Sequence, residues 1–267
     1  MNYFITTFSS LKTIVSHFFS FMKFNEREHS KGRKPILTNS EIVSCAVFKQ
    51  RQNIGSKKAL YEILEPPCSY NRFVVALNRV GTYLAKIITA VMRFLLKGAS
   101  LVKFTDATDI PVCLNKNANR HKTMYGLAEW SKTGKGLFYG LKLHLSGDAE
   151  GRTLALRFTP GNSDDRAVFK KMNEKLTGLF VADAGYVSQK LERDFFIERQ
   201  RLLITGSRKN MKKLSTPWQI ALLNLRMRVE IHFRVLKVCY GLVTSLPRSI
   251  DGYLTHYLAA IAAHLIA

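Results

Sequence analysis

The spacing of apolar side chains changes near residue 100, and this change constrains the fold more than any other feature of the chain. Up to about residue 95, apolar residues recur every three or four positions, which is the spacing of one face of an α-helix. The first helix shows it in Phe4, Phe8, Leu11, Val15, Phe18 and Met22. After residue 100, short apolar runs between turn-forming residues replace that spacing, as is typical of strands. We therefore predict an α+β (α/β) fold in which a helical bundle precedes a sheet.

Breaks and caps divide the helical region, residues 1–97. Residues 31–35 end the first helix, and a capping box follows, in which the Thr38 hydroxyl and the Glu41 carboxylate bind free amides at the start of the next helix. Pro66 and Pro67 make a second break, before helical spacing over residues 70–80 and 83–96. Basic residues on the polar faces suit contacts to the backbone of duplex DNA, although a merely solvated basic face looks the same.

The second region, residues 98–267, alternates strand-like and helix-like segments. Apolar runs predict strands over residues 101–105, 137–145, 153–158, 179–182 and 202–205, and a turn at 146–151 joins the second and third strands into an antiparallel hairpin. Helices are expected from Asp164 or Asp165 to residue 176, over 188–198, over 217–238, and over 253–267 as a closing helix. The predicted order is therefore βββαβαβα, a mixed sheet flanked by helices.

The charge of the chain points to a polyanionic partner. Lys and Arg number 41 against 19 Asp and Glu, which gives a net charge of +22. Repulsion among this many positive charges opposes compaction of the chain unless a polyanion offsets it. We expect that polyanion to be nucleic acid, here double-stranded DNA, rather than a lipid surface. A basic protein whose charge serves only solubility is the alternative.

The four cysteines and the N-terminal residues indicate a cytoplasmic protein. Cys45, Cys68, Cys113 and Cys239 lack the spacing of a zinc site or a disulfide framework, and their apolar neighbours predict buried thiols in a reducing compartment. Lys12 and His17 interrupt the apolar residues of segment 3–24, which argues against a signal peptide or a membrane span. We expect no membrane partner.

Three acidic residues stand where they could meet. Asp106 and Asp183 each follow an apolar strand, and Glu230 lies in the last long helix. Carboxylates that converge repel one another unless hard divalent cations lie between them. Two Mg²⁺ or Mn²⁺ ions held in this way would activate a water or a hydroxyl for displacement at phosphorus. The alternative is that Asp106 and Asp183 are ordinary caps at the ends of strands.

The segment around Glu230 has a conflicting pattern. Residues 225–235 alternate apolar and charged, which by periodicity alone predicts a strand. Its length, the absence of Gly and Pro between 218 and 239, and its Leu, Arg and Met content favour a helix. On a helix Arg226, Glu230 and Lys237 share one face, where Arg226 and Lys237 could hold phosphate while Glu230 holds metal.

Further polar residues are candidates for the same site. Lys142 and His144 alternate on one face of a strand and could face a phosphate, or equally could be a solvent-facing lysine and a buried histidine. Asp165 is either a fourth acid or a helix cap. The basic run that contains Arg208, Lys209 and Lys212 is interpreted as a phosphate clamp, with a solvated loop as the alternative.

At these residues the chain resembles the DDE transposases of bacterial insertion sequences, and most closely the 982 family. The similarity runs through Thr105–Cys113, Tyr139–His144, Asp165–Arg166, Ala182–Tyr186, Leu203–Thr205 with Arg208–Lys212, and Arg226–Glu230. The chain departs from the family pattern in Asp109, where Pro is usual, in Ala184, where Lys is frequent, and in Leu223, where a wider signature has Tyr.

The resemblance implies a ribonuclease-H-like catalytic domain over residues 98–267, with Asp106, Asp183 and Glu230 as its catalytic acids and metal ligands. It also implies cutting and joining of DNA at the ends of a mobile element by a homo-oligomer, using Mg²⁺ or Mn²⁺, in association with a bacterial nucleoid. Two alternatives stay open: a non-catalytic DNA-binding protein descended from a transposase, and a stand-alone metal-dependent DNA nuclease.

Overall fold

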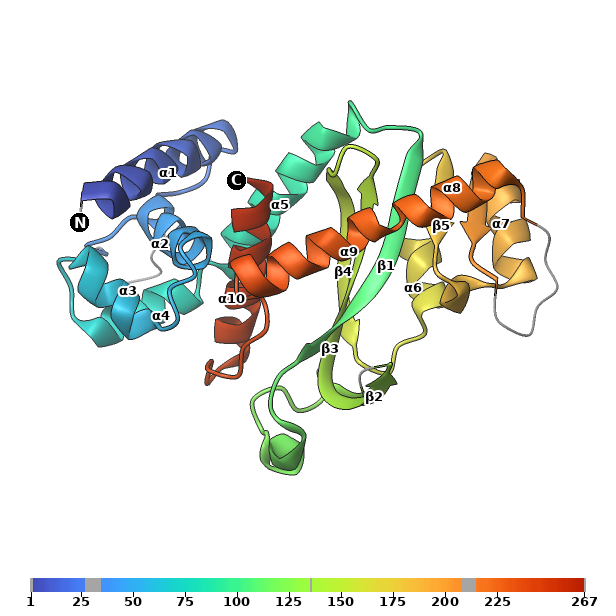
Figure 1. Ribbon diagram of the computed structural model, residues 1–267. Coiled ribbons are helices and arrows are strands. Elements are labelled where there is room, and N and C mark those ends of the chain that lie inside the picture. The colour runs from blue at the N-terminus through green and yellow to red at the C-terminus, as the bar shows by residue number, and fades with distance from the viewer. Residues whose placement is uncertain (1, 27–34, 135, 208–214, 267) are drawn as a thin grey trace. The chain divides into compact units, whose positions relative to one another are not determined.

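The computed structural model describes residues 2–26, 35–134, 136–207 and 215–266. It divides into two compact units, of which the first combines Met1–Val91 with Val235–Ala267 and the second is Met92–Arg234. The first unit is helical, and the second is a mixed sheet flanked by helices (Figure 1). The chain is thus α+β, as the change in periodicity predicts.

The first unit is built around α2 (Asn39–Arg51), which is buried over most of its length. Helices α1 (Asn2–Phe21), α4 (Tyr70–Asn78) and α10 (Ile250–Leu265) pack against it, and α3 (Lys57–Leu64) contacts α2 and α4. The predicted capping box is confirmed, because the Thr38 hydroxyl accepts from the Glu41 amide and the Glu41 carboxylate accepts from the Thr38 amide. Helix α5 (Gly81–Leu96) leads from this unit into the second.

The closing helix differs from the sequence-based division into 1–97 and 98–267. We expected residues 253–267 to belong with the sheet, but α10 packs on α2 and α4 in the first unit. Small buried residues make this close packing possible: Ala259, Ala260, Ala262 and Ala263. Order along the chain does not reveal that the C-terminal helix returns to the N-terminal bundle.

The sheet of the second unit combines antiparallel and parallel strands. It contains β1 (Val102–Pro111), β2 (Glu129–Thr133), β3 (Gly136–Asp148), β4 (Thr153–Pro160), β5 (Leu179–Ala182) and β6 (Leu202–Thr205). Strand β3 pairs antiparallel with β1, β2 and β4, whereas β1, β5 and β6 are parallel neighbours. The predicted hairpin of β3 with β4 is confirmed. The predicted element order omitted β2, a short strand paired with the first residues of β3.

Helices cover both faces of this sheet. Helices α6 (Asp165–Met172) and α7 (Gln189–Arg199) lie on one face, where Phe169, Phe180 and Phe195 form a buried aromatic cluster. Helices α8 (Pro217–Leu225) and α9 (Met227–Arg234) cross the other face (Figure 1). The helix predicted over 217–238 is therefore present, but it is interrupted at Arg226 and passes into a π-helical turn at Val235–Cys239.

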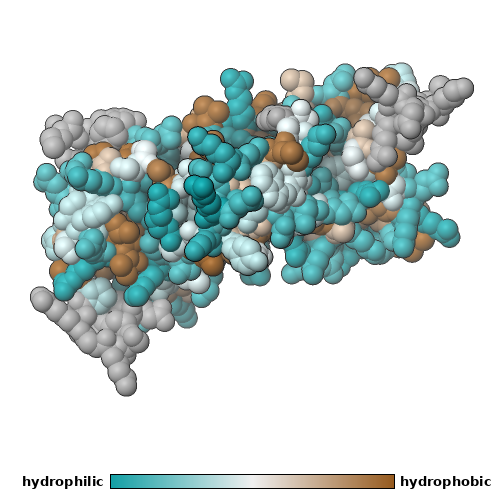
Figure 2. Space-filling model, turned by 90° about the horizontal axis from the view of Figure 1, so that it is seen from below, coloured by the Kyte–Doolittle hydropathy of each residue, from teal (hydrophilic) through white to brown (hydrophobic). Residues whose placement is uncertain are grey.

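The surface and the thiols refine two expectations. The face of the molecule drawn in Figure 2 is mostly hydrophilic, with scattered hydrophobic patches. All four cysteines are free, but only Cys45 is buried and Cys239 is exposed, so the prediction of four buried thiols is wrong. Within the described residues no single helix is long and apolar enough to span a membrane, although α4 and α5, bent by 44°, reach that length and composition together.

Candidate active site

The register of two parallel strands brings Asp106 next to Asp183. Strand β1 pairs with β5 up to Thr105 and Ala182, so the next residues are Asp106, still within β1, and Asp183, directly after β5. Strand β1 does not end at Asp106 as predicted, because its pairing with β3 continues to Pro111. The Asp106 carboxylate is 20% exposed and accepts a hydrogen bond of 2.8 Å from the Ala107 amide.

Asp183 lies at the point where β5 ends. It precedes the short 3-10 turn Ala184–Tyr186, and within the described chain its carboxylate makes no capping hydrogen bond there. The side chain is exposed. Neither aspartate therefore acts as an ordinary cap, which was the structural alternative for both residues.

Helix α9 adds a third carboxylate, Glu230, and Arg226, the residue between α8 and α9, adds a guanidinium that contacts Asp106. Arg226 Nη1 donates to Asp106 Oδ2 at 3.2 Å, and Arg226 Nη2 lies 3.0 Å from Glu230 Oε1. The second contact joins residues four apart, so the helical interpretation of this segment explains it and the strand interpretation does not. Arg226 is 23% exposed and Glu230 is 51% exposed.

Burial and like charges perturb Asp106. The pKa of Asp106 is raised from 3.8 to about 6, first by burial and then by the charges of Asp183 and Glu230. The Ala107 amide and Arg226 act in the opposite direction. The cause is an environment in which a negative charge on Asp106 is poorly solvated and lies near two other acids. A carboxylate in this condition is a candidate functional group.

Tyr186 is a neighbour of the acids that the sequence reasoning quoted in a motif but did not weigh. Its hydroxyl is buried without a hydrogen-bond partner among the described residues. Burial raises the pKa of Tyr186 well above its ordinary value, and the charge of Asp106 adds to this. In the sequence, the feature that could have pointed to Tyr186 as a neighbour of the acids is its position three residues after Asp183.

The carboxylate oxygens of these acids are the chemical type of ligand that a hard divalent cation, such as Mg²⁺ or Mn²⁺, prefers. A cation would stabilise the ionised form of Asp106, whose pKa is raised first by burial and then by the charges of Asp183 and Glu230. Across the described part of the chain, no three His, Cys, Asp or Glu side chains converge closely enough to hold one ion as they stand. The guanidinium of Arg226 supplies the positive charge between Asp106 and Glu230 instead.

Lys142 and His144 lie away from Asp106, and Asp165 pairs with Lys142. Asp106 pairs with Leu145 of β3, whereas Ala107 pairs with His144 and Asp109 with Lys142, so Lys142 and His144 are on the opposite face from Asp106. Lys142 Nζ donates to Asp165 Oδ1 at 2.8 Å. His144 is fully buried and bonded to Thr159, and burial lowers its pKa to about 4. The structure thus places Lys142 and His144 on the other face from Asp106, whereas the charge of Asp165 acts on Tyr186 together with those of Asp106 and Asp183.

The remaining basic candidates are not placed with the acids. Lys237 lies in the π-helical turn Val235–Cys239, which belongs to the first unit. Arg208, Lys209 and Lys212 lie outside the described residues. Asp165 begins α6, but the capping residue is Asp164, whose carboxylate accepts from the Arg166 amide.

Comparison with known proteins gives one family. The family described as "Transposase DDE domain" matches residues 97–249, more than half of the chain, and this span includes Asp106, Asp183 and Glu230. No curated protein matches the sequence. The crystal structure of the Mos1 strand transfer complex is similar at 11% identity, covering 94% of this chain and 82% of that chain, with a TM-score of 0.25. A TM-score this low does not establish a shared fold.

Proposed function

The chain belongs to the family of transposase DDE domains, and from this premise we propose that it is a DNA transposase whose catalytic acids are Asp106, Asp183 and Glu230. One observation carries the assignment: the half-buried Asp106 lies beside Asp183 in the strand register and is linked through Arg226 to Glu230. These contacts support a site built from three acids that are far apart in the sequence.

Asp106, Asp183 and Glu230 are the residues that would hold the divalent ions. When bound, Mg²⁺ or Mn²⁺ would lower the pKa of the attacking hydroxyl or water and neutralise charge on the phosphate. Arg226 forms ion pairs with Asp106 and Glu230. We propose that its guanidinium also holds a DNA phosphate at this site. Lys237, Arg208, Lys209 and Lys212 are proposed to hold phosphates along the DNA.

The wider assignment is part of the same proposal. The order of an antiparallel β1, β3 and β4 followed by parallel β5 and β6 supports a ribonuclease-H-like domain. The motifs around Asp106, Tyr139 and Asp183 support membership of the 982 group of insertion sequences. Double-stranded DNA is the proposed substrate, bound by a homo-oligomer at paired element ends.

A joining assay tests the proposal. The full chain is incubated with a pre-cut duplex from the flank of its own gene, a target plasmid and Mg²⁺ or Mn²⁺, and joined product is measured. We expect Asp183→Asn and Glu230→Gln to reduce joining to background while DNA binding persists. Asp109→Asn is the matched control, because it removes a carboxylate from the same strand but from the opposite face of the sheet.

The outcomes separate the alternatives. Joining that survives Asp183→Asn unchanged overturns the catalytic assignment. Cleavage without joining by the unsubstituted chain indicates a stand-alone nuclease, and binding without either reaction indicates a DNA-binding protein that has lost catalysis.

A further inference from the structure

Two lysines of the first unit line a small cavity among its helices. The cavity lies between α2, α3, α4 and α10, and its volume is about 20 Å³. Lys49 and Gln50 of α2 line it together with Lys57 of α3, and α10 contributes His256. Lys49 is only 8% exposed, although a lysine is almost never buried unless its charge is paired. The groups around the two lysines therefore have to account for a buried positive charge.

The polar neighbours of the two lysines are neutral. Lys49 Nζ has one long hydrogen bond, of 3.4 Å, to Gln50 Oε1, and Lys57 Nζ donates to Asn78 Oδ1. An ammonium group carries three N–H donors, so each lysine keeps donors that these bonds do not use. Both acceptors are side-chain amides, which satisfy a donor but do not offset a full positive charge.

His256 is held in its neutral form beside these amides. Gln50 Nε2 donates to the His256 carbonyl oxygen at 3.1 Å, which fixes the orientation of the amide, and the same nitrogen lies 2.8 Å from His256 Nδ1. Nδ1 therefore accepts, and Nε2 donates to the Gly241 carbonyl oxygen at 2.7 Å. Burial lowers the pKa of His256 to about 4, in agreement with a neutral ring.

No acid of the described chain offsets the charge of the two lysines. Burial and the charge of Lys57 lower the pKa of Lys49 to about 8, and burial lowers the pKa of Lys57. Among the described residues no carboxylate acts against these shifts. Lys49 is nevertheless mostly protonated at neutral pH, and a buried, unpaired ammonium group destabilises a fold. An anion between the two lysines would relieve both the lack of a partner and their mutual repulsion.

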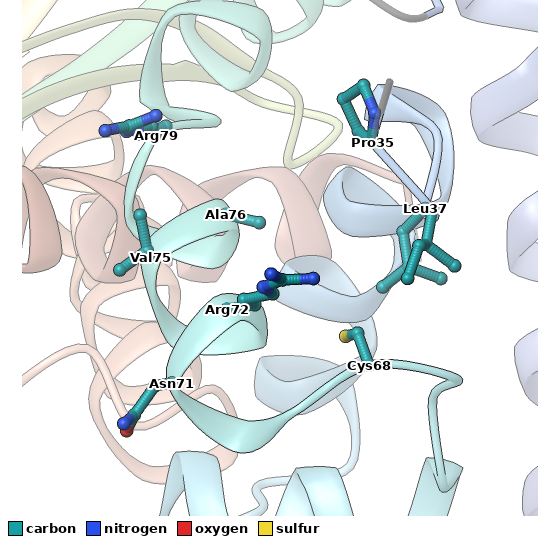
Figure 3. Close-up of a pocket in the computed structure, with 9 residues that line it drawn as sticks. Pro35, Leu37, Cys68, Asn71, Arg72, Val75, Ala76 and Arg79 are labelled. Atoms are coloured by element: carbon teal, nitrogen blue, oxygen red, sulfur yellow. The ribbon is translucent and has the colours of Figure 1, made fainter. Parts of the chain in front are cut away.

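A larger cavity of the first unit shows the contrast. It lies between α4 and Leu37, has a volume of about 480 Å³, and is lined by Arg72 and Arg79 among other residues (Figure 3). Both arginines are exposed, so water solvates their guanidinium groups. The charge at this larger cavity needs no bound partner, whereas the charge at the small one does.

We propose that the small cavity binds one chloride ion, held by the ammonium groups of Lys49 and Lys57. A volume of about 20 Å³ accommodates one species about the size of a water molecule, which suits a monatomic anion and is too small for phosphate or sulfate. A water molecule would accept the same hydrogen bonds but would leave the charges unpaired.

The ion would help to hold the closing helix in the first unit. Lys49 bonds to Gln50, and Gln50 bonds to His256 of α10, so the ion lies at the end of a chain of contacts that joins α10 to α2. This inference does not depend on the proposed catalytic function.

Hydrogen exchange followed by mass spectrometry tests the inference on the full chain. Exchange is measured at neutral pH and constant ionic strength while chloride replaces methanesulfonate, an anion too large for the cavity. Peptides from α10 report on the cavity that this helix lines. Peptides from α7, which belongs to the second unit, report any general effect of the salt.

Three substitutions complete the design. Lys49→Met and Lys57→Met each remove one ammonium group and keep an unbranched side chain. Lys58→Met is the matched control, because Lys58 follows Lys57 in α3 but its side chain is 75% exposed. Circular dichroism checks that each variant folds.

We expect chloride to slow exchange in α10, because opening of the helix releases the ion. The factor is one plus the ratio of the chloride concentration to Kd, which is about elevenfold at about ten times Kd. Lys49→Met and Lys57→Met should lose this response, and Lys58→Met should keep it. In methanesulfonate, Lys49→Met should exchange no faster than the unsubstituted chain, since it removes a buried unpaired charge.

The inference is overturned if chloride and methanesulfonate protect α10 equally, which is the result expected of a cavity that holds only water. It is also overturned if Lys49→Met keeps the full response to chloride, or if Lys58→Met loses that response. Should Lys49→Met fail to fold, Lys57→Met decides by the same criteria, because Lys57 is less buried.

Discussion

Replacing Asp106 by asparagine should stabilise the metal-free protein at neutral pH. The pKa of Asp106 is raised from 3.8 to about 6 because burial and the neighbouring acids disfavour its charge. The folded state therefore binds a proton more tightly than the unfolded chain does. The resulting stabilisation is fully present below pH 3.8 and is lost as the pH rises through about 6, so that at pH 7.5 the ionised Asp106 lowers the free energy of unfolding.

The size of this cost follows from the pKa shift. A change from 3.8 to about 6 corresponds to about 3 kcal/mol at about 1.4 kcal/mol per pH unit. The attraction of Arg226 is already included, because it is one of the influences on that pKa. Asparagine has nearly the same size, and its amide oxygen can still accept from the Ala107 amide. We expect Asp106→Asn to raise the free energy of unfolding of the second unit by about 2–3 kcal/mol at pH 7.5.

Tryptophan fluorescence during urea unfolding measures this effect selectively. Both tryptophans of the chain, Trp130 and Trp218, lie in the second unit. Titrations are run between pH 4 and 8 in EDTA, and the difference between variant and unsubstituted chain is plotted against pH. The difference should be largest above pH 7 and should approach zero near pH 4, where Asp106 is protonated.

Asp148→Asn is a control of opposite sign. Burial alone would raise the pKa of Asp148, but hydrogen bonds from Arg152 and the Ser100 amide hold it below the ordinary value. Its ionised form therefore stabilises the fold above pH 3.8, and Asp148→Asn should destabilise the second unit at pH 7.5. The reasoning is refuted if Asp106→Asn is no more stable than the unsubstituted chain at pH 7.5, or if its gain persists unchanged at pH 4.

Three further predictions concern the site, the core and the DNA contacts. Arg226→Gln removes a group that lowers the pKa of Asp106. In the same urea titrations, the pH at which the second unit loses stability should therefore move upward. An unchanged or lower pH would contradict this. Phe169→Ala should cost about 3–5 kcal/mol by tryptophan fluorescence, because Phe169 is buried against Phe180 and Phe195, and a cost below 1 kcal/mol would show that the cluster is not a core. The logarithm of DNA affinity should fall with the logarithm of salt concentration, with a slope near −5 for about six phosphate contacts, and a flat response would exclude phosphate binding as the main attraction.

Local sequence signals were sufficient for much of the fold. The capping box at Thr38, the strands Leu179–Ala182 and Leu202–Thr205, and the start of α7 after Ser188 are as predicted. Each depends on interactions between residues that are close in the chain, such as a side-chain cap or a short apolar run. The position of Asp183 at the end of β5 is also predicted by such a local signal, the short apolar run before it.

Long-range pairing decided what local signals could not. The sequence places Lys142 and His144 on one face of a strand, but the pairing of β1 with β3 puts that face opposite to Asp106. The interruption of the long helix at Arg226 and the return of α10 to α2 also depend on packing between distant residues.

The sequence by itself determined most of the helical and strand segments, the basic charge and three candidate acids. Only the tertiary structure decided that Asp106 lies in the middle of a strand, half-buried beside Asp183, and that Arg226 links it to Glu230. The physical reason is the separation along the chain of the residues that interact. Caps and periodicity act within a few residues, whereas the solvation and charge of a carboxylate depend on every group that the folded chain brings around it, including groups more than a hundred residues away.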